Sequence, residues 1–172
     1  MMGRRWRAVG WTVLVVGLGA CQGAGDDTPP PPTAEEAERH FEIGGEWSLE
    51  MRGNVAELRV YQSRRNLERG GELWAKVGPY VYLFSPGTRD LFSEEPGLAA
   101  VRVVTLAPDG EEVARATLTR GTLNSLTWRR ALNVAGLARR DGTQRPTRLE
   151  DLVEWGEDHT DYRYSPRYVE PT

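Results

Sequence analysis

The first clear pattern after the N-terminal region is a strict alternation of apolar and polar residues. From Trp47 to Arg52 every second side chain is apolar, and a period of two is typical of a strand with one buried face. Gly53-Asn54 supplies a tight turn, and the alternation resumes over residues 56–61. The pattern therefore predicts a β-hairpin over residues 47–61.

Shorter apolar runs predict four further strands. They fall at residues 72–77, 80–84, 99–106 and 111–119. Gly78-Pro79 and Pro108-Asp109-Gly110 have the composition of turns, and residues 85–97 are predicted to form a longer loop. This part of the chain is therefore predicted to be an antiparallel meander of about six strands.

The apolar pattern changes after Gly121. Apolar residues recur at three- and four-residue spacing over residues 123–140 and favour a helix, although Leu126, Trp128, Leu132 and Val134 also fall on even numbers and leave a strand open. A second helix is predicted from Thr147 to between Trp155 and His159. We therefore expect an α+β fold in which two C-terminal helices pack on the antiparallel sheet, with a small closed β-barrel or sandwich as the alternative.

The N-terminal residues have the pattern of an export signal. Residues 1–7 carry three arginines and no acid, and residues 8–20 are uncharged. A helix of that uncharged length reaches about 20 Å, which is shorter than the roughly 30 Å hydrocarbon core of a bilayer. The segment is therefore predicted to be a secretory signal rather than a membrane span.

The end of this segment, Leu18-Gly19-Ala20-Cys21, resembles the lipobox of bacterial prolipoproteins. The resemblance implies that Cys21 receives a diacylglycerol, that residues 1–20 are removed as a signal peptide, and that the new amino terminus is acylated. Several acyl chains hold a protein stably on a bilayer. Because Gln22 stands where relatives retained in the inner membrane carry Asp, the resemblance favours the outer membrane.

Residues 21–41 are predicted to be a tether. They contain four consecutive prolines, Pro29 to Pro32, which favour an extended polyproline spacer. Thr33 and Glu36 have the spacing of a capping box, which predicts a short helix over residues 34–41. Residues 42–172 are then expected to form a single globular domain.

Composition narrows the classes of function. The chain of 172 residues is 39% hydrophobic and contains one Cys and two His, which fits one domain without an intramolecular disulfide. Loss of residues 1–20 removes three arginines and no acid, so the net charge falls from −3 to −6. Export and this acidic balance argue against nucleic acid as a partner.

No residue of the sequence is predicted to be catalytic, cofactor-binding or metal-binding. The nearest cluster is Glu157, Asp158, His159 and Asp161. Such a group would suit a small hydrolase or a metal-dependent enzyme, which we keep as the alternative function.

The stretch after this cluster is rich in tyrosine and arginine. These two residue types are common on recognition surfaces, so we expect a partner-binding surface formed by Tyr162, Arg163, Tyr164, Arg167 and Tyr168. An edge strand that packs its tyrosines on the core is the alternative.

The sequence thus predicts a membrane-anchored envelope lipoprotein that acts as a non-enzymatic binding or assembly module. Its expected partners are the bilayer, through acylated Cys21, and another envelope protein or cell-wall glycan.

Overall fold

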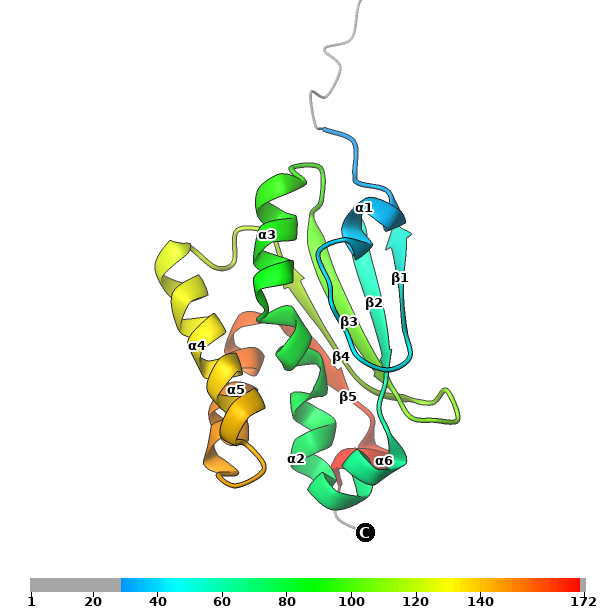
Figure 1. Cartoon of the computed structure of the whole chain (residues 1–172), viewed down its shortest axis with the longest axis vertical. Coiled ribbons are helices and arrows are strands. Elements are labelled where there is room, and N and C mark those ends of the chain that lie inside the picture. Colours follow the sequence, from blue (N-terminus) through cyan, green and yellow to red (C-terminus); the bar gives the residue numbers. More distant parts are fainter. Residues whose placement is uncertain (1–28, 171–172) are drawn as a thin grey trace, which may run out of the picture.

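The computed structural model describes residues 29–170 (Figure 1). The predicted signal peptide, Cys21 and the first part of the predicted tether lie outside the described residues. Helices and strands alternate along the described chain, so the predicted α+β class is confirmed.

The strands form one open sheet of five. They are β1 (Trp47–Arg52), β2 (Val55–Tyr61), β3 (Ala100–Leu106), β4 (Glu112–Thr119) and β5 (Asp161–Tyr164), in the spatial order β1-β2-β3-β4-β5. Neighbours are antiparallel except β2 and β3, which are parallel. The predicted antiparallel meander of about six strands is therefore wrong in its pairing and its strand number, and the sheet is not closed into a barrel.

Both predicted hairpins are present. β1 and β2 are joined at Arg52↔Val55 through Gly53, whose φ of 62° is the left-handed conformation that glycine adopts without strain. β3 and β4 are joined by the predicted Pro108-Asp109-Gly110 turn, where Gly110 has a φ of 86°. Local alternation and turn chemistry were sufficient to place these four strands.

The segment between β2 and β3 is helical, so the two strands predicted at residues 72–77 and 80–84 are wrong. It forms α2 (Arg64–Leu83), which is interrupted at Gly71, where φ is 55° and ψ is −147°. Val77, Tyr80 and Phe84 are fully buried at three- and four-residue spacing, which is a helical stripe rather than two alternating runs. Parallel pairing of β2 with β3 also requires a crossover over one face of the sheet.

The loop predicted at residues 85–97 is also wrong, because most of this segment is helical. Residues Pro86–Glu94 form α3. Ser85 caps this helix by accepting a hydrogen bond from the Thr88 backbone N–H at 3.2 Å, and Pro86 occupies its first turn, where a missing N–H costs nothing.

Of the helix and the strand that the sequence allowed for residues 123–140, the structure contains the helix. α4 (Ser125–Asp141) is capped by Asn124, and α5 (Thr147–His159) follows after a short turn. α5 packs mainly against α2 and α4, while α2 lies directly on β3 and β4. The two C-terminal helices therefore cover the sheet partly through α2, which the prediction did not include.

The helices α2 to α5 lie on one face of the sheet (Figure 1). The core between the two layers contains Leu58, Val101 and Val103 of the sheet, each fully buried. The short helix α1 (Ala34–Glu38), with the predicted Thr33–Glu36 capping box, adds Ala37 to the same core, and Phe41 follows it there. A last short helix, α6 (Pro166–Val169), follows β5.

The opposite face of the sheet carries long charged side chains instead of helices. At its centre Glu57, whose side chain is 7% exposed, is contacted by Arg59 Nε at 3.1 Å, Arg52 Nε at 3.1 Å and Arg102 Nη1 at 3.3 Å. Burial raises the pKa of the Glu57 carboxyl, but the bonds from Arg59 and Arg102 and the charge of Arg52 outweigh it, so the pKa lies below its usual value.

Candidate functional site

The five tyrosines and arginines predicted to bind a partner do not form one surface. Tyr162 is 42% exposed, and Arg163 is exposed on the helix-free face of the sheet. The other three make contacts inside the domain. The edge strand that the sequence allowed is present as β5, which pairs with β4.

Tyr164 fastens β5 to the helix layer. Its hydroxyl donates to Glu157 Oε1 at 3.0 Å and lies 2.6 Å from the hydroxyl of Tyr80, which is fully buried in α2. Burial, the Tyr80 hydroxyl and the Glu157 carboxylate all raise the pKa of Tyr164. Tyr164 therefore stays protonated and serves as a structural bridge.

Arg167 and Tyr168 contact the turn between β3 and β4. Both reach Glu111: Arg167 Nη1 pairs with Glu111 Oε2, and the Tyr168 hydroxyl donates to the same oxygen at 3.2 Å. These contacts hold α6 against the sheet.

The acidic cluster around His159 is divided among different surroundings. The His159 ring stacks on Trp155 at 3.9 Å, and its Nδ1 lies 2.8 Å from the Trp155 carbonyl oxygen. Glu157 is held by Tyr164, whereas Asp158 is exposed. The structure does not bring the four ionisable groups together, and residues 29–170 contain no group of three or more His, Cys, Asp or Glu placed to hold a metal ion.

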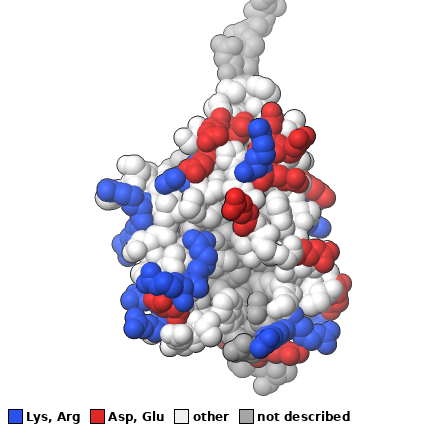
Figure 2. All heavy atoms as spheres, viewed as in Figure 1, with Lys and Arg blue, Asp and Glu red and all other residues white. Residues whose placement is uncertain are grey.

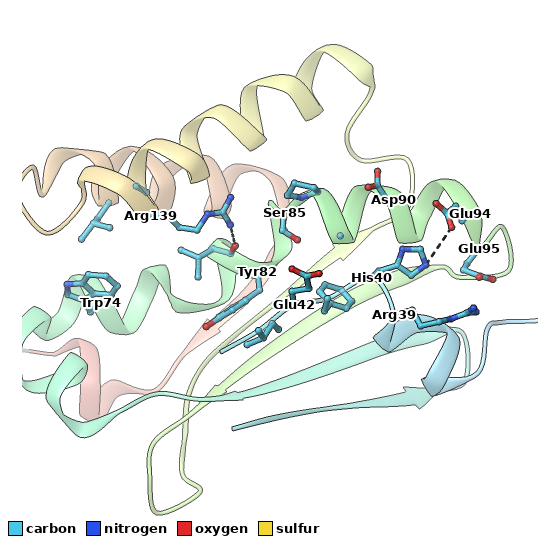
Figure 3. Close-up of a pocket in the computed structure, with 17 residues that line it drawn as sticks. Arg39, His40, Glu42, Trp74, Tyr82, Ser85, Asp90, Glu94, Glu95 and Arg139 are labelled. Atoms are coloured by element: carbon cyan, nitrogen blue, oxygen red, sulfur yellow. Dashed lines mark hydrogen bonds and ion pairs between the residues drawn. The ribbon is translucent and has the colours of Figure 1, made fainter. Parts of the chain in front are cut away.

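A groove of about 920 Å³ lies beside the helix layer (Figure 3). Its walls come from the segment 39–43, from α2 and α3, and from the facing parts of α4 and α5. Trp74 lies toward one end of it, and His40 and Glu94 lie toward the other (Figure 3). A volume of this size suits a small molecule or a short peptide segment.

The groove combines apolar walls with charged groups. The apolar and aromatic side chains are Phe41, Ile43, Trp74, Val81, Tyr82, Pro86, Ala138 and Leu149. The charged groups of the lining are four carboxylates, Glu42, Asp90, Glu94 and Glu95, and two guanidinium groups, Arg39 and Arg139. Figure 2 shows acidic side chains gathered at the end of this face that carries α1 and α3. With His40 neutral, the lining therefore has a net charge of −2, which favours a ligand with a cationic group.

Several of these charges already have partners in the fold. His40 Nε2 lies 3.9 Å from Glu94 Oε2, and Arg89 Nε bonds Asp90 Oδ1 at 2.9 Å. Glu42 and Glu95 make no side-chain ion pair with the described residues. Figure 3 shows Glu42 in the middle of the groove, between Trp74 and His40. The Glu42 carboxylate is therefore the group best placed to meet a cation.

Arg139 links the α4 wall of the groove to the α2 wall. Its Nη1 donates to the Val81 carbonyl oxygen at 2.5 Å and so joins α4 to α2 across the groove (Figure 3). Burial lowers the pKa of the Arg139 guanidinium, and the nearby Tyr82 opposes that shift. Burial in turn raises the pKa of Tyr82. Arg139 remains charged at neutral pH.

The segment 39–43 can form the other wall because α3 has a glycine beneath it. A Cβ on Gly87 would lie 2.0 Å from the His40 carbonyl oxygen. The backbone of residue 40 therefore rests directly on α3, and no larger residue fits without displacing that wall.

The sequence did not indicate this groove. Its residues come from four separated parts of the chain, and two of the elements that line it, α2 and α3, were predicted as strands and loop. No role was predicted from the sequence for His40, Glu42 or Trp74. The three- and four-residue spacing of apolar residues over residues 73–84 was the signal in the sequence that would have placed the α2 wall of the groove.

Comparison with known proteins gives no relative: no protein-family model, curated protein or solved structure matches the chain. Among the described helices, none combines the length and the apolar character that a membrane span requires.

Proposed function

We propose that the protein is a lipid-anchored lipoprotein of the bacterial envelope whose head domain binds a partner in the groove between residues 39–43 and the helix layer. The observation that carries the binding role is the composition of this groove, whose lining combines aromatic and aliphatic side chains with two carboxylates, Glu42 and Glu95, that make no ion pair with the described residues. Apolar walls with a few placed charges are the usual composition of ligand sites.

The anchor part of the proposal is supported by the sequence. The single Cys of the chain, Cys21, follows the uncharged run and the small residues Gly19 and Ala20. Acyl chains on Cys21 hold the chain on the bilayer, with the outer membrane as the favoured site.

The partner that fits the groove best is a segment of another envelope protein with an apolar side chain and a nearby Lys or Arg. The apolar side chain packs against Trp74 and Val81, and the cation meets Glu42. Lining carboxylates outnumber guanidinium groups four to two, so an acidic segment is repelled. A cell-wall glycan is the other partner class expected in this compartment, and the aromatic rings of Trp74 and Tyr82 would serve it by stacking.

The anchor is tested by fractionation. Wild-type protein is expected with the membranes, and Cys21→Ser protein in the soluble fraction. A Cys21→Ser protein that still partitions with membranes would contradict the lipid anchor.

The role of the groove is tested by comparing substitutions at two glutamates, Glu42 and Glu46, which are four residues apart in the chain. Glu42 lines the groove, whereas Glu46 is exposed outside it. The partner is first identified by its recovery with the wild-type protein from detergent-solubilised envelope. Glu42→Gln is expected to lower that recovery about tenfold, the loss that one charge-assisted contact typically produces. Glu46→Gln should retain it. Equal recovery by the two variants would overturn the groove as the binding site.

A further inference from the structure

A second cavity of about 670 Å³ lies on another side of the domain, between α3, the end of β4 and the start of α4. Its walls are mainly apolar and are formed by Phe92, Leu118, Leu123, Trp128 and Leu132. The rings of Phe92 and Trp128 lie 6.4 Å apart at 56°, so the two helices present their aromatic side chains together.

The charged groups that line this cavity are all cations. They are Arg89, Arg120 and Arg129, and no described Asp or Glu belongs to the lining. The cavity thus has the opposite electrostatic character to the groove, whose lining is acidic. This separation argues for a different kind of ligand.

The three arginines are held in different ways. Arg120 donates to the carbonyl oxygens of Leu98 and Phe92 at 2.5 Å each, and it makes no ion pair with a described carboxylate. Arg89 forms an ion pair with Asp90, in which Arg89 Nη2 lies 2.8 Å from Asp90 Oδ1. Arg129 is exposed and has no ion-pair partner among residues 29–170. Arg120 therefore supplies a fixed positive charge, and Arg129 a free donor.

Two further features lie at the start of α4, the helix that supplies part of the cavity wall. Leu126 is 64% exposed, the most exposed large apolar side chain of the described domain. Ser125, at the start of α4, belongs to the lining, and the amino end of a helix adds partial positive charge. An exposed apolar side chain, Leu126, thus lies three residues before Arg129 on α4.

We propose that this cavity binds a single-chain anionic amphiphile, an acyl chain that carries a carboxylate or phosphate head. The chain lies between Phe92, Trp128 and Leu132, and the head meets Arg129 above the charge of Arg120. This site is independent of the groove and of the partner proposed for it.

Titration calorimetry of the full-length protein tests the site with dodecanoate below its critical micelle concentration. Arg129→Gln is expected to weaken dodecanoate binding about tenfold, whereas Arg129→Lys, which keeps the charge, should stay within about threefold. Arg145→Gln removes one exposed arginine outside the cavity and should leave the affinity unchanged. Dodecyltrimethylammonium, with the same chain and a cationic head, should not bind.

A vesicle arm distinguishes a free amphiphile from a bilayer lipid. Binding of monomeric dodecanoate that falls in Arg129→Gln supports a free ligand. Binding confined to phosphatidylglycerol vesicles, with none to monomeric dodecanoate, would assign the site to a membrane headgroup and would overturn the single-chain ligand. The proposal is also overturned if Arg129→Gln binds dodecanoate as the wild type does, or if the cationic amphiphile binds equally.

Discussion

The hydroxyl of Tyr80 lies 2.6 Å from the hydroxyl of Tyr164, although the two residues are 84 positions apart in the chain. Tyr80 belongs to the fully buried stripe of α2, and Tyr164 is the last residue of the edge strand β5. Because Tyr164 also donates to Glu157 of α5, this one side chain ties the edge of the sheet to two helices.

Loss of the Tyr164 hydroxyl should therefore destabilise the domain. Tyr164→Phe removes the bridge and leaves the buried Tyr80 hydroxyl without that partner, so we expect the free energy of unfolding to fall by about 1–2 kcal/mol. Tyr162→Phe, two residues away and exposed, is the matched control and should change it by less than about 0.5 kcal/mol. Urea unfolding measures both. Equal stability of the two variants would show that the bridge contributes nothing.

The same bridge predicts a loss of stability at high pH. Burial raises the pKa of both Tyr80 and Tyr164 above their ordinary value of 10.0. The neutral hydroxyls are therefore favoured in the folded state, and their contribution is complete below pH 10.0 and is lost as the pH rises above it. Urea titrations from neutral pH to above pH 10.0 should show this loss in the wild type and a smaller loss in Tyr164→Phe. Identical slopes for the two proteins would exclude Tyr164 as the source.

The Glu57 cluster predicts the opposite dependence in acid. Its three arginine contacts stabilise the ionised carboxylate and lower the pKa of Glu57 from 4.5, so this contribution is present above that pH and is lost as the pH falls below it. Glu57→Gln should lower the free energy of unfolding at neutral pH by about 2 kcal/mol and should flatten the acid side of the profile. Glu50→Gln, which removes an exposed ion pair with Arg52, should cost less than about 1 kcal/mol. A steep acid profile in Glu57→Gln would show that other carboxylates dominate.

The wall of the groove can be tested without touching its charges. Gly87→Ala places a methyl group 2.0 Å from the His40 carbonyl oxygen, so the segment 39–43 must move away from α3. We expect a loss of about 1–3 kcal/mol and, from the displaced wall, weaker partner recovery. Gly44→Ala, in the same connection but with no atom within 4 Å of the added Cβ, should be close to neutral. Thermal unfolding gives the comparison, and equal melting temperatures would mean that residue 40 does not rest on α3.

Local patterns predicted the parts of this fold that depend on neighbouring residues. The two hairpins, the capping box at Thr33 and the helices α4 and α5 are set by alternation, turn glycines and three- to four-residue spacing, all visible in the sequence. The strand β5 was visible only as an alternative.

The error at α2 has a local cause. The apolar residues at 73, 77, 80 and 84 have the spacing of a helical stripe, but Gly78-Pro79 divides them into two short runs that also have the pattern of alternating strands. A proline inside a helix costs one hydrogen bond, and burial of Val77, Tyr80 and Phe84 outweighs it. With α2 and α3 misassigned, the crossover, the parallel pair β2–β3 and the groove could not be foreseen.

The candidate site was less predictable than the fold because binding depends on which side chains are left unpaired. Tyr164, Arg167 and Tyr168 looked like recognition residues by composition, yet each finds a partner inside the domain. Glu42 was assigned no role from the sequence, yet with Glu95 it is one of the two groove carboxylates that make no ion pair with the described residues.

Site-specific photo-crosslinking in intact cells tests the central claim most directly. A photoreactive residue replaces Val81, which lines the groove, or Ser48, which is exposed on β1 outside it. We predict that the Val81 position gives one discrete adduct with an envelope component, that the adduct fractionates with membranes, and that the Ser48 position does not give it. The same adduct at both positions, or none at Val81, would contradict an envelope lipoprotein that binds its partner in this groove.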